Sequence, residues 1–393
     1  MKLNKTFGRI ATTLVATAML ASLAAPVYAY EVPTDDNTGS SITTDKPYQE
    51  GSSFYITKYL TKDAKTMVPD IDFEFEVTPV TGASGTRSNM PIKDGIQGAV
   101  TADTTEGTAS FVPGGELDQN TTVYDKVKFN INVKAFVVPE GAEDPDAYGV
   151  GVYKYSIREK DITGTTGITK DTNSLDLYVY IVNDGMGGLE VAYTELVDPN
   201  GSADGGEVKM DSFTNDYGTK PGYEDNVNDL VVYKVLTGDA ADMGDTFEFT
   251  VQIDGEDGEK YYVEFGTYAV KDGVGTFTSN GQNDIWDSRS SETVRLGNNA
   301  AFKVYGLDTD DTYTVTEDEN DAAGYKVFIN DSETASTDRK ATGTLTQDGV
   351  IKFDNNKESV TPTGLVMDIA PYVLLVVVAA AGCFVFLRKR RED

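Results

Sequence analysis

Three kinds of reactive side chain recur in the same order in both halves of this 393-residue chain, and each ends or interrupts a run of alternating apolar residues. They are Lys58, Glu159 and Asn215 in the first half, and Lys234, Glu317 and Asn355 in the second. Residues two apart in a strand share a face, so all six are expected to point into a core. Burying such groups unpaired costs several kcal/mol each, so the repetition indicates a use for them.

These residue types can form a covalent bond between their side chains. Burial lowers the pKa of a lysine and raises that of a glutamate, which leaves a neutral amine beside a carboxylic acid. If the acid polarises the asparagine carboxamide, the amine attacks its carbon and expels ammonia, leaving an amide (isopeptide) bond. A lysine snorkelling at a sheet edge and an asparagine closing a strand would explain one triad alone. The ordered recurrence favours the bond in both halves.

The elements that carry these residues are predicted to be strands. From Phe54 onward, short alternating runs rich in Tyr, Val, Ile, Phe and Thr are separated by Gly and Asp clusters, which is typical of an all-β sandwich. Lys58–Thr61 recurs as Lys234–Thr237, and Phe73–Val77 recurs as Phe247–Val251. Two divergent copies of one β-domain are the simplest explanation.

The predicted organisation has six segments. They are a signal peptide (1–29), a flexible leader (30–46), a first β-sandwich domain (47–217), a linker (218–228), a second β-sandwich domain (229–358) and a C-terminal sorting segment (359–393).

Both ends of the chain predict export and surface attachment. Basic residues precede an apolar run at 10–23 and a small-residue site that ends at Ala29, as in a secretory signal peptide. Near the C-terminus, Val360–Gly364 reads Val-Thr-Pro-Thr-Gly and precedes an apolar stretch at 369–387, long enough for a transmembrane helix. Four basic residues at 388–391 would hold that end in the cytoplasm.

Composition excludes several classes of function. The formal net charge of -31 would repel phosphate backbones, so nucleic acid is not expected as a partner. The chain has no histidine and one cysteine, Cys383, which lies in the sorting segment, so neither disulfides nor zinc sites are expected. Acidic clusters at Asp254–Glu259 and Asp308–Asp311 lack EF-hand spacing and are interpreted as solvated hairpin turns. No cofactor or metal is predicted.

The repeated Lys-x-Leu-Thr, Tyr-x-(Ile or Val)-x-Glu and Phe-x-Asn motifs resemble the pilin isopeptide-linkage domains of Gram-positive backbone pilins. The resemblance implies two tandem immunoglobulin-like domains, in which a first-strand lysine is joined autocatalytically to a last-strand asparagine with the help of a glutamate. It assigns Lys58 to Asn215 with Glu159, and Lys234 to Asn355 with Glu317. In the second domain, Asn356 beside Asn355 leaves the partner of Lys234 open.

The C-terminal segment resembles a cell-wall sorting signal, which implies that a sortase cleaves between Thr363 and Gly364 and transfers Thr363 to an amine. The implied partners are a pilus or housekeeping sortase, other copies of the chain, minor pilins and peptidoglycan, with a host ligand left open. No enzymatic activity is expected beyond the autocatalytic bonds.

In a polymer, a lysine late in the first domain would receive Thr363 of the next subunit. Lys209 is the candidate by position. Its strand parity matches that of Asn215, so Lys209 would face inward if one regular strand runs through both residues, which counts against it. Lys220 and Lys170 are the alternatives. A monomeric cell-wall-anchored adhesin built from the same domains is the alternative function.

Overall fold

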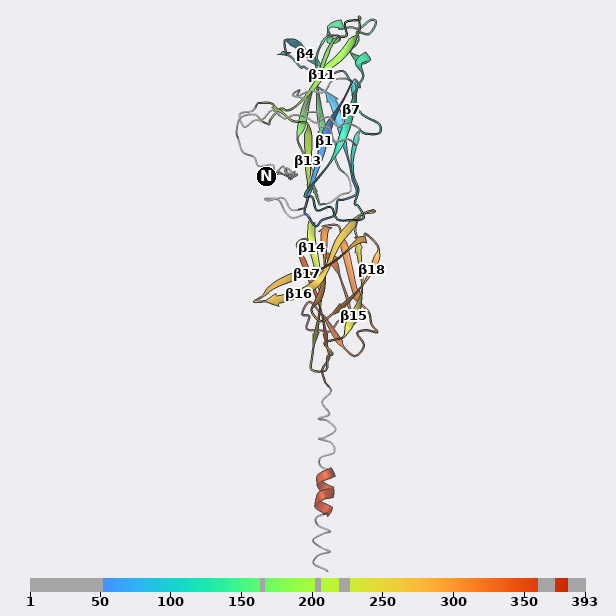
Figure 1. The fold of residues 1–393 in the computed structure, drawn as a ribbon, viewed down its shortest axis with the longest axis vertical. Helices are drawn as coiled ribbons and strands as arrows, with labels where there is room; N and C mark the ends of the chain where they lie inside the picture. The colour runs from blue at the N-terminus through green and yellow to red at the C-terminus, as the bar shows by residue number, and fades with distance from the viewer. Residues whose placement is uncertain (1–51, 163–166, 202–205, 219–226, 360–371, 381–393) are drawn as a thin grey trace, which may run out of the picture.

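The chain folds into two β-domains arranged end to end (Figure 1). The computed structural model describes residues 52–162, 167–201, 206–218, 227–359 and 372–380. Strands dominate, and the first domain adds two short 3-10 helices, η1 (Val133–Phe136) and η2 (Pro145–Ala147). The prediction of an all-β protein is confirmed over the described parts of the two domains.

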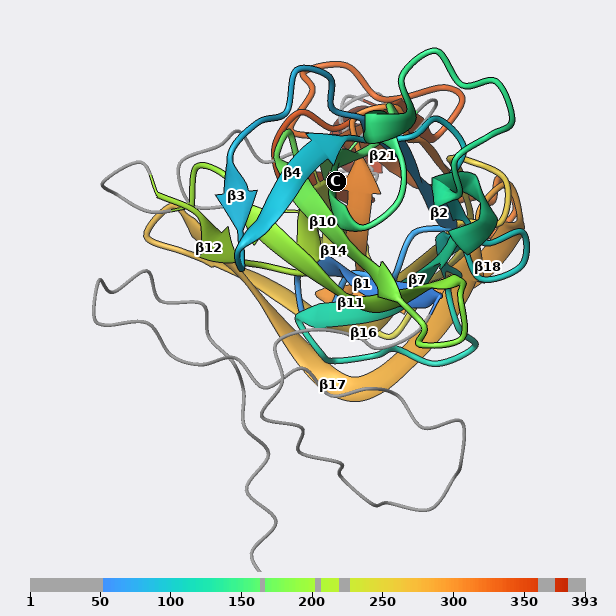
Figure 2. The same ribbon diagram turned by 90° about the horizontal axis from the view of Figure 1, so that it is seen from above.

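The first domain contains two sheets. One has the strand order β5 (Val100–Ala102), β7 (Thr122–Ile131), β1 (Ser53–Lys62), β13 (Ser212–Tyr217) and β9 (Ile168–Thr169). The other has the order β12 (Val208–Lys209), β11 (Leu189–Asp198), β10 (Ser174–Asn183), β8 (Gly151–Glu159), β2 (Ile71–Pro79) and β6 (Thr108–Phe111). A small hairpin of β3 (Thr86–Arg87) and β4 (Met90–Asp94) adjoins β8 and is visible to one side in Figure 2.

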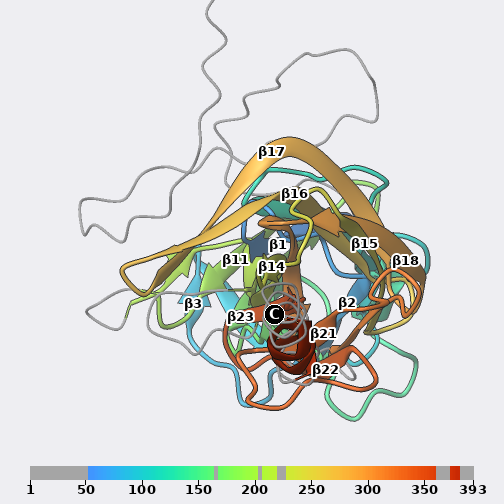
Figure 3. The same cartoon turned by 90° about the horizontal axis from the view of Figure 1, so that it is seen from below.

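The second domain also has two sheets (Figure 3). The larger has the order β17 (Val274–Asp287), β16 (Lys260–Lys271), β19 (Ala300–Asp308), β14 (Val227–Thr237), β23 (Gly349–Asn356) and β21 (Lys326–Ile329). The smaller has the order β18 (Ser291–Gly297), β15 (Thr246–Asp254), β20 (Thr312–Glu317) and β22 (Lys340–Thr344).

Alternating side chains build each core. Phe54, Ile56 and Leu60 of β1 are buried, and in β15 the alternation of buried and more exposed residues continues along the whole strand. Aromatic rings from the two sheets meet inside the domains. In the first domain, for example, Phe75 contacts Phe213 with ring centroids 5.1 Å apart. Burial of these apolar faces supplies the main driving force for closing the sandwich.

The first and last strands of each domain are parallel neighbours in the same sheet. β1 pairs with β13 so that Leu60 lies opposite Asn215, and β14 pairs with β23 so that Leu236 lies opposite Asn355. Each glutamate ends a strand of the facing sheet, β8 or β20. The two domains therefore place their predicted reactive residues at equivalent positions.

The junction between the domains is packed and ion-paired. Lys65, after β1, pairs with Glu264 of β16 at 2.7 Å, and Met67 packs against Tyr262 and Tyr305 of the second domain. Tyr217, at the end of the first domain, donates a hydrogen bond to Glu259.

The interpretation of the acidic clusters as solvated turns is wrong for Glu259, Asp308 and Asp311, which are buried at this junction. Tyr261 contacts both Glu259 and Asp311 at 3.0 Å, and the amide of Asp308 donates to Asp311. The turn-like composition of the clusters does not indicate that these three side chains lie against the first domain.

No helix in the described residues is long and apolar enough to cross a membrane. The predicted span at 369–387 is described only at 372–380, which are helical, and its remainder lies outside the described residues. The signal peptide, the leader and the Thr363-Gly364 motif also lie outside them.

Candidate functional site

In the first domain, three buried side chains form a closed set of hydrogen bonds. Lys58 Nζ lies 2.5 Å from Glu159 Oε2 and 2.5 Å from Asn215 Oδ1. Asn215 Nδ2 donates to the other carboxylate oxygen, Glu159 Oε1, at 2.7 Å. The side chains of Lys58 and Glu159 have no exposed surface. The carboxylate therefore bridges the amine and the nitrogen of the carboxamide.

The sheets explain why these atoms meet. Lys58 lies opposite Phe213 in the parallel pair, so Asn215 is two residues further along on the same face. Glu159 reaches them from β8, where it lies opposite Phe75 of β2. The ring of Phe73, also on β2, lies 4.3 Å from Lys58 Nζ and excludes water from one side of the amine.

A fourth group reaches the same carboxamide from a loop. The backbone amide of Asp171 donates to Asn215 Oδ1 at 3.1 Å. The carboxylate of Asp171 accepts hydrogen bonds from the amides of Asn173 and Thr214, which fastens the loop to β13. Sequence reasoning missed Asp171, although Asp171-Thr172-Asn173 has the composition of an Asx-turn.

The second domain assembles the equivalent residues with fewer contacts. Lys234 Nζ and Asn355 Nδ2 both lie 2.7 Å from the same oxygen, Glu317 Oε1. Among the described residues, Glu317 Oε2 and Asn355 Oδ1 are buried without a hydrogen-bond partner. The adjacent Asn356 points elsewhere, because its Nδ2 donates to Thr237 and Glu358. The geometry thus selects Asn355 over Asn356 as the asparagine beside Lys234.

Burial dominates the electrostatics of both lysines. Removal from water lowers the pKa of Lys58, against the attraction of Glu159. Burial likewise lowers the pKa of Lys234 to about 8, and it raises the pKa of Glu317. Each shift favours the uncharged form of the group and hence a neutral amine capable of nucleophilic attack.

The first-domain arrangement can carry out an amide exchange. The lone pair of neutral Lys58 Nζ would attack Asn215 Cγ, and Glu159 would accept a proton from the nitrogen and return one to Nδ2. Breaking the Cγ–Nδ2 bond then releases ammonia and leaves a secondary amide. The amine, the carboxamide and the proton carrier are already in contact, so the reaction starts with little loss of translational entropy.

Lys209 lies apart from the triads and is exposed. It belongs to β12, in the sheet that does not contain β13, so the expectation that shared parity with Asn215 turns it inward is wrong. Its Nζ lies 3.4 Å from Glu195 Oε1. Lys170 pairs with Asp161 and immediately precedes Asp171 in the chain, and Lys220 lies outside the described residues.

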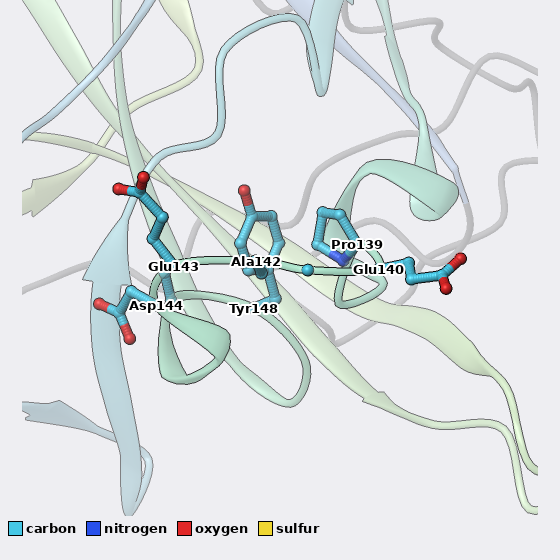
Figure 4. A pocket seen from close by; sticks show the side chains of 8 residues that line it. Pro139, Glu140, Ala142, Glu143, Asp144 and Tyr148 are labelled. Carbon is cyan, nitrogen blue, oxygen red and sulfur yellow. The ribbon is translucent and has the colours of Figure 1, made fainter.

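A surface hollow occurs on one loop of the first domain, between residues 139 and 148. Pro139, Glu140, Glu143, Asp144 and Tyr148 are among its lining residues (Figure 4). It contains no residue of either triad. Within the described parts of the chain, no group of three or more acidic, cysteine or histidine residues is arranged to hold a metal ion.

Comparison with known families matches each domain separately. Residues 54–218 match the Spy0128-like isopeptide containing domain, and residues 228–357 match a domain of unknown function, DUF7601. The chain thus carries an isopeptide-type pilin domain followed by a second β-domain.

Two sequence relatives add to this result, one along most of the chain and one along about a third of it. The chain is 24% identical over 351 residues to a pilin of Streptococcus pyogenes serotype M1, covering 86% of this chain and 91% of that one. It is 30% identical over 140 residues to the pilus tip adhesin Cpa of Streptococcus pyogenes, covering 35% of this chain and 18% of that protein.

Solved structures share the fold. The major pilin T3.2 from Streptococcus pyogenes matches with a TM-score of 0.54 at 19% identity, over 79% of this chain and 100% of that one. A second major pilin from the same species matches with a TM-score of 0.52 at 19% identity and the same coverage. The first domain thus matches an isopeptide-containing domain, and the chain is similar to a pilin over most of its length.

Proposed function

We propose that the chain is the backbone subunit of a sortase-assembled pilus and that an autocatalytic isopeptide bond closes each of its immunoglobulin-like domains, 47–217 and 229–358. The bonds join Lys58 to Asn215, with Glu159 as the catalytic group, and Lys234 to Asn355, with Glu317. The observation that carries this proposal is the buried contact of Lys58 Nζ with both Glu159 and the Asn215 carboxamide.

The position of the bonds suits a load-bearing subunit. Each would join the first strand of a domain to the last strand, which is its parallel neighbour. Tension that enters at one end of the domain would cross to the other through a covalent link, and the strands between them would carry little of it. Shaft subunits experience this kind of load.

Polymerisation would use Thr363 as the donor and Lys209 as the acceptor. A sortase would cleave between Thr363 and Gly364 and transfer the threonine carbonyl to the amine of the next subunit, or to peptidoglycan at the base. Exposure of Lys209 at one edge of the first-domain sheet supports its choice.

The alternative function is a monomeric wall-anchored adhesin, and the match to a pilus tip adhesin favours keeping it as an alternative. Cell-wall extracts distinguish this monomer from the polymer. Expression with a cognate pilus sortase should give a ladder of SDS-resistant species, and Lys209→Arg should reduce it to single subunits. A single wall-linked species from the wild-type chain would contradict the shaft role. A ladder that persists in Lys209→Arg would overturn only the choice of lysine.

A further inference from the structure

The amide of Asp171 lies where negative charge would develop during formation of the first bond. Attack on Asn215 Cγ moves the carbonyl electron pair onto Oδ1, so the tetrahedral intermediate carries an oxyanion at that atom. Lys58 Nζ donates to Oδ1 before the reaction but uses its lone pair for bonding during the attack. Both oxygens of Glu159 face nitrogen atoms, Nζ and Nδ2, and neither is hydrogen-bonded to Oδ1.

We infer that the backbone N–H of Asp171 is the oxyanion donor of the first-domain reaction, and that the Asp171 carboxylate positions it. This inference deepens the proposed function and rests on it. The amide is 3.1 Å from Oδ1 in the unreacted arrangement, within reach of the charge that develops there. Preorganised donors of this kind act without reorganisation at the moment of reaction.

The same amide selects the reactive orientation of the carboxamide. A backbone N–H can only donate, so it requires Oδ1, and not Nδ2, on its side of Asn215. Nδ2 is then held against Glu159 Oε1, where it can receive a proton and leave as ammonia. One N–H thus orients both the electrophilic carbonyl and the leaving group.

The side chain of Asp171 makes the loop rigid enough for this role. Its Oδ2 accepts from the amide of Thr214, the residue before Asn215, at 2.8 Å. Its Oδ1 accepts from the amide of Asn173 at 2.9 Å. The donor is therefore tied to the strand that carries its target, so the two move together.

The second domain provides an internal comparison. Asn355 Oδ1, the equivalent atom, is buried and has no donor within the described residues. Within the described part of the chain, its carboxamide is hydrogen-bonded through Nδ2 and not through Oδ1. Of the two sites as described, the first has the backbone donor.

A matched pair of chains isolates the N–H. One chain keeps Asp171, and in the other Asp171 is replaced by malic acid, which keeps the carboxylate side chain but replaces the backbone amide with an ester. The two full-length mature chains are made in a short cell-free pulse, quenched in denaturant at intervals and digested. The fraction of linked Lys58–Asn215 peptide is then followed by mass spectrometry.

The ester chain should form the first-domain bond about a hundredfold more slowly than the chain with Asp171, the usual loss for one oxyanion donor. The second-domain bond in the same molecules should form at an unchanged rate. The same amide-to-ester change at Thr172, an exposed position in the same loop, should leave the first-domain rate unchanged. Circular dichroism matched to that of Glu159→Ala verifies that the ester chain folds.

Equal first-domain rates in the folded amide and ester chains would overturn the oxyanion role while leaving the bond itself intact. Absence of any linked peptide from the wild-type chain would instead refute the proposed function. Asp171→Asn, which keeps one acceptor oxygen, should recover part of the rate lost in Asp171→Ala if the carboxylate positions the loop. Equal rates in Asp171→Asn and Asp171→Ala would overturn the positioning role.

Discussion

The two domains place the same three residues in the same strand register, yet their sites differ in how the carboxamide is held. In the first, Asn215 Oδ1 accepts from Lys58 and from the amide of Asp171, whereas in the second Asn355 Oδ1 has no partner in the described chain. The fold thus brings the reactive residues together, while a neighbouring loop determines how well the electrophile is prepared.

The two glutamates also differ in how they contact the lysine and the asparagine. Glu159 uses one oxygen for the lysine and the other for the asparagine, so it can pass a proton between them. Glu317 offers a single oxygen to both nitrogens and leaves its second oxygen unpaired. A buried carboxylate oxygen without a partner is costly. The second site is therefore held by fewer hydrogen bonds than the first.

The largest expected effect comes from removing the glutamate of the first site. Glu159→Ala should abolish the Lys58–Asn215 bond, because within the described residues Glu159 is the carboxylate that contacts both nitrogens. It should leave the second bond intact, so the shortfall of the intact mass from the mass calculated for each sequence should fall from two ammonia losses in wild type to one in the variant. Loss of the cross-link should lower the free energy of unfolding of that domain by about 5 kcal/mol on the chain-entropy model. Glu317→Ala is the matched control, and a linked first domain in Glu159→Ala would contradict the assignment.

The next effect is a difference in rate between the domains of the wild-type chain. The first bond should form about tenfold or more faster than the second, because a backbone amide donates to Asn215 Oδ1 whereas Asn355 Oδ1 has no donor among the described residues. Pulse synthesis followed by peptide mapping measures both rates in one sample. Equal rates, or a faster second domain, would show that the additional contacts of Asn215 do not govern the reaction.

The rate at which the second-domain bond forms should depend on pH through the protonation of Lys234. The pKa of Lys234 is lowered to about 8, so the fraction of neutral amine rises as the pH increases through that value and levels off above it. The rate of ammonia loss from the second domain should rise in the same range. The rate should be measured on refolded, unlinked chain between pH 6 and 9. A rate that falls over this interval would mean that a protonated group limits the reaction.

The smallest expected effect is the loss of stability when a threonine of the first strand is replaced, and this loss should be the same in both domains. Thr61 donates to Asp216 at 2.8 Å, and Thr237 donates to Asp354 at 2.7 Å, each tying the first strand to the last on the face opposite the lysine. Thr61→Val and Thr237→Val, each made in its unlinked Glu→Ala background, should lower stability by about 1 kcal/mol. Thr→Ser at either position should restore most of it. Markedly unequal losses in denaturant titrations would show that the strand pairs are less alike than their register indicates.

Much of the site could be predicted from the sequence because its residues lie on regular strands. Alternation alone predicted that Lys58, Glu159 and Asn215 point inward, and the recurrence in the second half indicated a shared role. Asp171 was missed because it contributes a backbone group from a loop, and backbone hydrogen bonding to a distant strand has no residue-type signature.

Two other features could not be predicted from the sequence and were found only in the tertiary structure. Glu259, Asp308 and Asp311 have the composition of solvated turns but are covered by the first domain, which local sequence does not record. The expectation that the Lys209 side chain points inward depended on one continuous strand from Lys209 to Asn215, whereas β12 and β13 lie in different sheets. Both errors arise from contacts between segments that are distant in the chain.

Proteolysis of the mature chain followed by mass spectrometry tests the central proposal most directly. The account predicts one branched peptide that joins Lys58 to Asn215 and another that joins Lys234 to Asn355, each lighter by one ammonia than the sum of its two linear parts. Linear peptides that contain all four residues unmodified, from a chain shown to be folded, would contradict it.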